Sequence, residues 1–393
     1  MSPAAPARPK PLAHVRVLDL SRLLPGPMAT LHLADLGADV IAIRPVAETD
    51  PPGPRKALHR MLHRNKRGLA IDLTRPAGRD LFLHLARQTD VVVEGFRPGV
   101  VDRLGIGYQS MREINPRVVY CSISGYGQSG PDRLHAGHDI NYMAASGVAD
   151  QIGASGGPPA IPNLQIGDLL GGSLTAVMGI LAGLVDAQAR GMGRYVDVAM
   201  TDSLMAHSVL ALSALCASGR TAPRGEDILT GALPCYGYYR AADGRYLAVG
   251  ALEAKFWERL CVALGHPELK SKHMVSGDEA ERVRAELQAI FGAQSSDHWV
   301  RELRGVDCCV NVVLTLEEVI AGEHARAREM VRETECDETG TFREFAPPLK
   351  MSDFRFESDS PCSRGRTHTD EILGAAGYSL QQINDLRAAG IVG

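Results

Sequence analysis

Short apolar runs alternate with helical stretches along the first 200 residues of the chain. The run at residues 15–20 is followed by a Pro/Gly turn, a helical stretch at 28–36 and a second apolar run at 38–43. A strand, a helix and a strand in this order predict a βαβ unit, which requires a parallel sheet with helices packed on it. The alternation continues with expected strands at residues 68–73, 90–94, 117–124 and 194–198, and expected helices at 77–88, 169–190 and 200–218.

The pattern changes after Gly219, where a polar stretch contains a proline and a glycine. Two short strands flank the turn Ala241-Ala-Asp-Gly244 and predict a β-hairpin. Three helical stretches and one further strand follow between residues 253 and 313. We therefore expect an α/β fold with a second, smaller α+β domain of about 100 residues in this part of the chain.

Composition and charge exclude several classes of protein. The 393 residues are 45% hydrophobic and carry a net charge of −4, which suits one large or two medium cores and argues against a general nucleic-acid-binding protein. No run approaches eighteen consecutive apolar residues, so we expect no membrane span. The Pro/Ala-rich start has no apolar core and is typical of a disordered leader rather than a signal peptide.

The eight cysteines and thirteen histidines show no spacing typical of a metal site. The cysteines are scattered and form no C-x-x-C pair, which favours reduced core thiols and a cytoplasmic protein. The turn after the first strand lacks G-x-G-x-x-G, so we expect neither a nicotinamide nor a flavin cofactor.

Two groups of cations are candidates for binding an anion. Arg64, Lys66 and Arg67 cluster just before the expected strand at 68–73. Composition alone favours a solvated rim over an anion site for this cluster. Arg97 is the better phosphate candidate, because it follows the strand at 90–94 on a tight turn, and ligands bind at the carboxyl ends of parallel strands.

Asp168 precedes the long helix at 169–190 and has two interpretations. Aspartate is among the best N-cap residues, so a purely structural capping role is one of them. The other is chemical, because Gly171 and Gly172 in the next turn reduce helix stability and would clear space above the carboxylate. A cap alone does not require that space.

His138, Asp139 and Glu253 are weaker candidates when judged singly. His138 alone would be an ordinary polar residue, and Asp139 is a candidate N-cap whose helix has free N–H groups that could hold an oxyanion. Glu253 is most simply a charge in the first turn of a helix. The residues by themselves thus allow an α/β enzyme with a His/Asp acid–base pair and go no further.

At these positions the chain resembles the family III coenzyme A transferases, and within them the α-methylacyl-CoA racemase branch. The resemblance covers most of the chain and is carried by motifs in one order: Leu18-Asp-Leu, Leu33-Ala-Asp-Leu-Gly-Ala-Asp-Val-Ile41, Arg64-Asn-Lys-Arg67, Glu94-Gly-Phe-Arg-Pro-Gly-Val100, Ser124-Gly-Tyr-Gly-Gln-Ser-Gly-Pro131, Gly137-His-Asp-Ile-Asn-Tyr142, Gly167-Asp168, Gly193-Arg-Tyr-Val-Asp-Val-Ala-Met200, Gly250-Ala-Leu-Glu253 and Gly365-Arg-Thr-His-Thr-Asp-Glu-Ile-Leu373.

The resemblance implies a Rossmann-like large domain and an interlocked homodimer, with each active site between one subunit's large domain and the other's small domain. The domain boundaries that we expect are 1–200 for the large coenzyme A-binding domain and 201–224 for a linker helix. The small domain would span 225–325, and a return segment over 326–393 would complete the large domain.

The resemblance also assigns roles to residues. His138 and Asp168 would exchange a proton with the α-carbon of an acyl-CoA thioester from opposite faces, and Glu253 would orient or tune a catalytic residue. Coenzyme A would be held as part of the substrate, with no other cofactor. The substrate-binding residues would be Arg64, Lys66, Arg67, Arg97, Tyr126, Gly137 and Asp139, the last through backbone N–H groups near the enolate oxygen.

Three functions remain open at this level. The racemase-like Gly137-His138-Asp139 and Glu253 motifs, without a transferase-type run of glycines, favour a 2-methylacyl-CoA racemase. A coenzyme A transferase would use Asp168 as a nucleophile, and a non-catalytic coenzyme A-binding paralogue is the third alternative. Two features depart from the family pattern: Ala42 and Arg44 at the end of the second strand, and one extra residue between Asn163 and Asp168.

Overall fold

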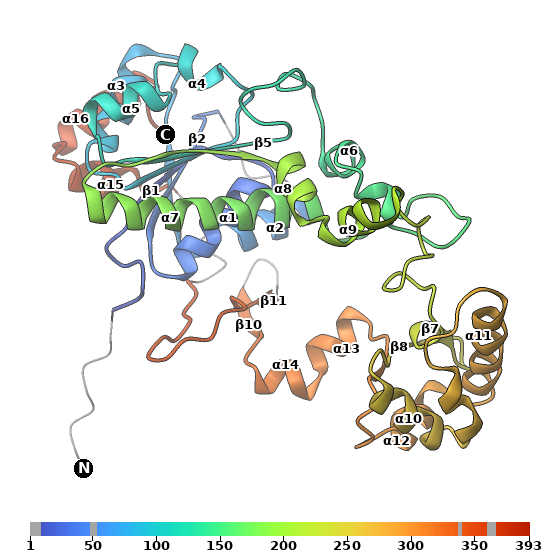
Figure 1. Ribbon diagram of the computed structural model, residues 1–393. Helices are drawn as coiled ribbons and strands as arrows, with labels where there is room; N and C mark the ends of the chain where they lie inside the picture. The colour runs from blue at the N-terminus through green and yellow to red at the C-terminus, as the bar shows by residue number, and fades with distance from the viewer. Residues whose placement is uncertain (1–8, 48–52, 337–339, 360–366) are drawn as a thin grey trace. The chain divides into compact units, whose positions relative to one another are not determined.

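A computed structural model describes residues 9–47, 53–336, 340–359 and 367–393 (Figure 1). The chain divides into two compact units. The larger unit contains Met1–Ser146, Pro162–His207 and Ala327–Gly393, and the smaller contains Gly147–Ile161 and Ser208–Arg326. Most of the expected leader lies outside the described residues.

The larger unit is built on a six-stranded sheet in which every neighbouring pair of strands is parallel. The strand order β3-β2-β1-β4-β5-β6 is that of a Rossmann-like, doubly wound sheet. The predicted α/β class is therefore confirmed. The strands are β1 (Arg16–Asp19), β2 (Asp39–Arg44), β3 (Lys66–Ala70), β4 (Val91–Glu94), β5 (Val119–Ser124) and β6 (Tyr195–Ala199).

Helices cover both faces of this sheet (Figure 1). One face packs against α1 (Pro25–Asp35) and α7 (Thr175–Arg190). The helices on the other face include two from the end of the chain, so the C-terminal segment helps to form the core of the larger unit. These helices are α3 (Pro76–Ala86), α5 (Tyr108–Ile114), α15 (Thr369–Ala375) and α16 (Leu380–Ala388). The remaining elements of this unit are α2 (Pro54–Leu62), α4 (Val100–Arg103), α6 (Asp139–Ala145), α8 (Met200–His207), β10 (Val331–Cys336) and β11 (Gly340–Phe345).

The long apolar helix over Gly167–Arg190 begins with a π-helical segment, η2 (Gly167–Leu174), and continues as α7. Its length and composition would suit a membrane span. In this fold it is a core helix, because residues such as Ile180 are buried against the sheet. A Cβ on Gly183 would come within 2.8 Å of Val119 Cγ1, so the absence of a side chain there allows α7 to pack closely on β5.

The smaller unit is an α+β unit around an antiparallel sheet of order β7-β8-β9. Strands β7 (Tyr236–Arg240) and β8 (Tyr246–Gly250) form the expected hairpin, and β9 (Val310–Val312) pairs with β8. Trp257 and Phe291 are fully buried in its core. The helices of this part of the chain are α9 (Val209–Ser218), α10 (Ala254–Ala263), α11 (Gly277–Gly292), α12 (Ser296–Glu302), α13 (Leu316–Ala321) and α14 (Glu323–Ala327).

Two features differ from the expected organisation. The helix predicted over residues 200–218 is two helices, α8 and α9, and the two units are divided between them. The segment Gly147–Ile161, expected in the large domain, packs with the smaller unit instead. Arg224 holds it there, because its guanidinium donates hydrogen bonds to the Gly157 carbonyl at 2.7 Å and to the Asp150 carboxylate at 2.8 Å.

Candidate active site

The loops at the carboxyl ends of β1, β4 and β5 enclose a pocket of about 560 Å³ in the larger unit. The strand order reverses between β1 and β4, so the loops that follow these two strands diverge and leave a crevice between them. Doubly wound sheets bind their ligands in such a crevice. Among the predicted site residues, Arg97, Tyr126, Gly137, His138 and Asp168 line this pocket together.

Asp168 lies in the first turn of η2 and does not cap it, because the N-cap residue is Ile166. The capping interpretation is therefore wrong. Burial and the neighbouring Asp139 carboxylate raise the pKa of Asp168 to about 6, and His138 opposes part of that rise. A carboxyl with a pKa near neutral can both accept and return a proton at physiological pH. Short π-helical segments within longer helices are often found at functional sites.

The Asp139 side chain holds the backbone beside this carboxyl. Its Oδ1 accepts a hydrogen bond from the backbone N–H of Asp168 at 3.0 Å. A Cβ on Gly167 would come within 3.0 Å of the same oxygen, so the glycine permits this contact. The prediction that Asp139 caps α6 is wrong, since the N-cap residue is His138 and Asp139 is the first residue of the helix.

Gly171 and Gly172 serve close packing rather than clearing space above the Asp168 carboxylate. A Cβ on Gly171 would come within 3.0 Å of the Met200 carbonyl oxygen, and one on Gly172 within 2.7 Å of Pro25 Cβ. The glycines thus bring η2 against α8 and the start of α1. That packing fixes the turn from which the Asp168 side chain projects.

His138 reaches the pocket from a different element than Asp168. It precedes α6, and its backbone N–H donates a hydrogen bond to Asn141 Oδ1 at 3.0 Å. This contact fixes the backbone of His138 while its side chain lines the pocket. An imidazole and a carboxyl from two separate elements therefore face one cavity, as the sequence predicts.

Two tyrosines form the wall of the pocket next to His138. The rings of Tyr126 and Tyr142 meet edge to face with centroids 5.4 Å apart, and the Tyr142 hydroxyl donates a hydrogen bond to the Gly137 carbonyl at 2.5 Å. A Cβ on Gly125 would come within 2.2 Å of the Tyr142 ring, and one on Gly137 within 2.6 Å. The absence of a side chain at both positions is needed for this wall.

Glu94, a buried carboxyl to which the sequence analysis assigned no role, holds the turn that carries Arg97. Glu94 Oε2 accepts a hydrogen bond from the Phe96 backbone N–H at 2.7 Å and another from the Ser122 hydroxyl. Burial raises the pKa of Glu94 to about 7. Its position directly after three valines was the available signal, because an acid that ends a fully buried strand must find partners.

Arg64 and Lys66 are part of the protein interior rather than of the pocket. The Arg64 guanidinium pairs with the Asp35 carboxylate at 2.5 Å and also donates to the Phe345 carbonyl at 2.6 Å. The Lys66 ammonium lies 3.3 Å from the Asp19 carboxylate, with its side chain 1% exposed. These cations are already paired and buried, so the phosphate-binding role and the solvated rim predicted for the cluster are both wrong for Arg64 and Lys66.

Arg67 is partly exposed and is also paired, with Asp39 at 2.7 Å and with Glu371 at 3.0 Å.

Other cations lie at the carboxyl edge of the sheet. A second pocket of about 420 Å³ shares Arg22 and Phe96 with the first and is lined as well by Arg44. Arg44 is one of the residues that depart from the family pattern, and the structure puts this cation at the second pocket.

Glu253 lies in the smaller unit, exposed, as the N-cap residue of α10. Its side chain makes no capping hydrogen bond there. Asn163 and Gln165, before Asp168, likewise make no side-chain hydrogen bond within the described part of the chain.

Comparison with known proteins decides the family. The family model described as CoA-transferase family III matches residues 12–364. The chain belongs to CoA-transferase family III. It is similar to alpha-methylacyl-CoA racemase of Homo sapiens, with 35% identity over 381 residues and 97% of each chain covered. It is nearly as similar to succinyl-CoA:glutarate CoA-transferase of Homo sapiens, with 31% identity over 98% of this chain and 90% of that protein.

The fold agrees with this assignment. The crystal structure of a CAIB/BAIF family protein from Brucella suis matches with a TM-score of 0.80 at 26% identity, covering 94% of this chain and 100% of that chain. As a member of CoA-transferase family III, the protein is an enzyme that acts on an acyl-CoA. Racemases and transferases are close to it in identity, so the chemistry of the pocket must discriminate between them.

Proposed function

We propose that this family III enzyme inverts the α-carbon of a 2-methyl-branched acyl-CoA by proton transfer on both faces. The observation that carries the proposal is that His138 and Asp168 come from different elements and line one pocket. Inversion requires one acid–base group on each face of a planar enolate. An imidazole and a carboxyl of pKa about 6 are both suited to that task near neutral pH.

In the forward direction one of the two groups takes the α-proton, and the electron pair of the broken C–H bond moves onto the thioester oxygen. The other group then gives its proton to the opposite face, which forms the new C–H bond and restores the carbonyl. A backbone N–H at the start of α6, beside His138, would stabilise the negative enolate oxygen. The reaction is balanced without a further reactant, because one proton is removed and one is returned.

The cations at the carboxyl edge would hold the phosphates of coenzyme A. Arg97 lines the first pocket, Arg44 the second, and Arg22 both. Guanidinium groups bind phosphates through paired, charge-assisted hydrogen bonds. This assignment replaces the one suggested by sequence for Arg64 and Lys66, and the nucleotide would then extend from the first pocket toward the end of β2.

We also propose the homodimer that the resemblance implies. Helix α9 supports it, because its apolar residues Val209, Leu210 and Leu212 are all more than half exposed and none of its ten residues is buried. In such a dimer Glu253 of one subunit would act on His138 of the other. Sedimentation velocity should give a dimer for the native chain and a monomer for Leu212→Glu. A native monomer at micromolar concentration would contradict this part of the proposal.

Incubation with a 2-methylacyl-CoA in D₂O tests the function. Deuterium should enter the α-position, and a single enantiomer should become a mixture of both. His138→Ala should abolish inversion. The proposal fails if branched acyl-CoA thioesters bind but exchange no α-proton, or if His138→Ala inverts them at the native rate.

A coenzyme A transferase is the second candidate, supported by the 31% identity to the human glutarate transferase. The Asp168 carboxylate would attack the thioester carbonyl, and coenzyme A would leave as the thiolate, forming a mixed anhydride. Hydroxylamine would then trap an acyl group on Asp168, and coenzyme A would move to a free carboxylic acid. A chain that binds coenzyme A but shows neither exchange nor transfer would be a non-catalytic paralogue.

A further inference from the structure

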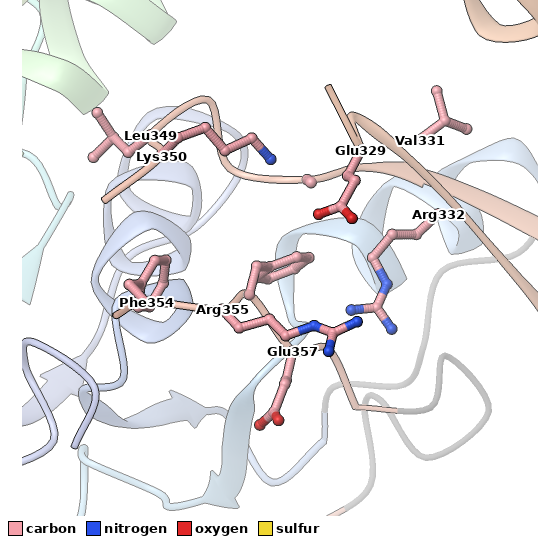
Figure 2. A pocket seen from close by; sticks show the side chains of 10 residues that line it. Glu329, Val331, Arg332, Leu349, Lys350, Phe354, Arg355 and Glu357 are labelled. Atoms are coloured by element: carbon pink, nitrogen blue, oxygen red, sulfur yellow. The ribbon is translucent and has the colours of Figure 1, made fainter. Parts of the chain in front are cut away.

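A pocket of about 430 Å³ in the larger unit has no part in the proposed reaction. It lies between the β10–β11 hairpin region and the extended segment that follows it (Figure 2). Its lining combines apolar and charged side chains: Glu329, Val331, Arg332, Ala346, Leu349, Lys350, Phe354, Arg355, Phe356 and Glu357.

Three cations face this pocket, Arg332, Lys350 and Arg355. None of them has an ion-pair partner among the residues that the structure describes. Figure 2 shows the guanidinium groups of Arg332 and Arg355 directed toward the same side of the pocket. The positive charges of these side chains repel one another across the cavity. An anion bound between them would offset this repulsion and would itself be stabilised by the cations.

Acidic residues of the lining balance only part of this charge. Glu357 is already paired with Lys10, whose ammonium lies 3.5 Å from its carboxylate. Glu329 is the other acid, so three unpaired cations stand against one unpaired carboxylate among the described lining residues. The pocket therefore has an excess of positive charge.

One wall of the pocket is already rigid. The guanidinium groups of Arg64 and Arg332 both lie over the Phe356 ring, 5.1 Å and 5.2 Å from its centroid. Arg64 is itself fixed by its buried pair with Asp35. Arg332 is thus held in place by a cation–π contact, which leaves its donors available to a ligand and reduces the entropy lost on binding.

This pocket and the candidate active site lie at opposite ends of the strands. Arg64 lies two residues before the first residue of β3 and is therefore at the amino end of the sheet, whereas His138 and Asp168 line the pocket at the carboxyl ends. An acyl-CoA bound as proposed would leave the β10–β11 pocket open. The inference that follows does not depend on whether the enzyme is a racemase or a transferase.

We infer that the β10–β11 pocket binds a small organic phosphate, with the phosphate between Arg332 and Arg355 and an apolar part against the Phe356 ring. A planar guanidinium presents paired donors that match phosphate oxygens. Lys350 supplies a further positive charge. The 430 Å³ cavity admits a ring-sized apolar group beside the phosphate.

Titration calorimetry with phenyl phosphate tests the inference, in the presence of saturating coenzyme A so that the acyl-CoA site is filled. We expect one binding site per chain. Benzyl alcohol, which lacks the charge, should not bind. Inorganic phosphate, which lacks the ring, should bind more weakly.

The double variant Arg332→Gln/Arg355→Gln should weaken phenyl phosphate binding by about tenfold or more, since two charge-assisted contacts are lost. Arg343→Gln is the matched control, because Arg343 lies on β11 but pairs with Glu333 and does not line the pocket. Its affinity should equal that of the native chain. Unchanged melting temperature and unchanged coenzyme A affinity would show that the double variant is folded.

Three outcomes would overturn the inference. Phenyl phosphate does not bind, the folded double variant binds it as tightly as the native chain, or inorganic phosphate binds equally well. The last result would leave an anion site without the apolar part of the ligand.

Discussion

Charged residues of the larger unit fall into two groups that differ in how completely they are paired. At the buried ion pairs, Arg64 meets Asp35 and Lys66 meets Asp19, and every cation has its carboxylate. At the pocket, Asp168 has no ion-pair partner among the described residues, and burial together with the Asp139 carboxylate raises its pKa. Complete pairing stabilises a fold, whereas incomplete pairing near an open cavity keeps a group available for proton transfer.

The largest expected effect comes from removing the unpaired carboxyl. Asp168→Asn should lower α-proton exchange by about 10²- to 10⁴-fold, the usual range for a lost general acid–base group. The rate of deuterium incorporation at the α-carbon, followed in D₂O by quenching the reaction at set times, would measure this loss. Coenzyme A affinity should stay within about twofold of native, because binding rests on other residues. If Asp168→Asn exchanges the α-proton at the native rate, Asp168 has a structural role only, like the residues of the buried ion pairs.

Breaking a complete pair should affect stability. Arg64→Leu leaves the Asp35 carboxylate buried without its cation, and we expect the free energy of unfolding to fall by about 3–5 kcal/mol. Urea denaturation followed by circular dichroism would measure the loss. The double variant Arg64→Leu/Asp35→Leu should recover part of it, since no lone charge remains. Equal destabilisation in both variants would mean that packing, not pairing, matters at this site.

Glu94 shares features of both groups of charged residues, because it is buried and yet positions a turn of the pocket. Glu94→Ala removes the acceptor of the Phe96 N–H and should raise the KM for acyl-CoA by about tenfold, equivalent to one lost hydrogen bond. Glu94→Gln retains an oxygen acceptor and should restore KM. Steady-state kinetics at pH 6 and pH 8 would compare them. The native pH dependence of KM near pH 7, where Glu94 ionises, should vanish in Glu94→Gln.

The smallest effect is on stability as a function of pH. The folded pKa of Asp168, about 6, lies above its unfolded value of 3.8, so ionisation opposes folding. The stability that the protonated form contributes is complete below pH 3.8 and is lost as pH rises through 6. Asp168→Asn should therefore melt slightly higher than the native protein at pH 8, and the gap should close toward pH 4. Scanning calorimetry would measure it, and a lower melting temperature at pH 8 would contradict the reasoning.

Apolar patterning predicted the sheet well. Runs such as residues 15–20 and 90–94 became β1 and β4, because continuous buried strands of a parallel sheet must be apolar on both faces. The helix over 200–218 was predicted as one element and is two. Apolar residues lie on both sides of His207 and Ser208, so the apolar pattern alone did not separate α8 from α9; Ser208, the N-cap residue of α9, was the available signal.

The candidate site was predicted in part. His138, Asp168, Arg97, Tyr126 and Gly137 do meet in one pocket. The cation cluster was misjudged, because neighbours in sequence point in different directions, and nothing local reveals that Asp35 and Asp19 lie opposite Arg64 and Lys66. The buried acids in Leu18-Asp-Leu20 and Ala34-Asp-Leu36 were the overlooked signal, since a carboxylate inside an apolar run requires a buried partner.

The sequence by itself determined the α/β class, the family and the pair His138 and Asp168, because periodicity and short motifs are local and survive in a linear chain. Only the tertiary structure decided which charges are paired. Pairing depends on atoms a few ångströms apart in space that can lie 304 residues apart in sequence, as in the ion pair between Arg67 and Glu371. It also decided that Gly171 and Gly172 serve packing, since the atoms that they avoid belong to α1 and α8.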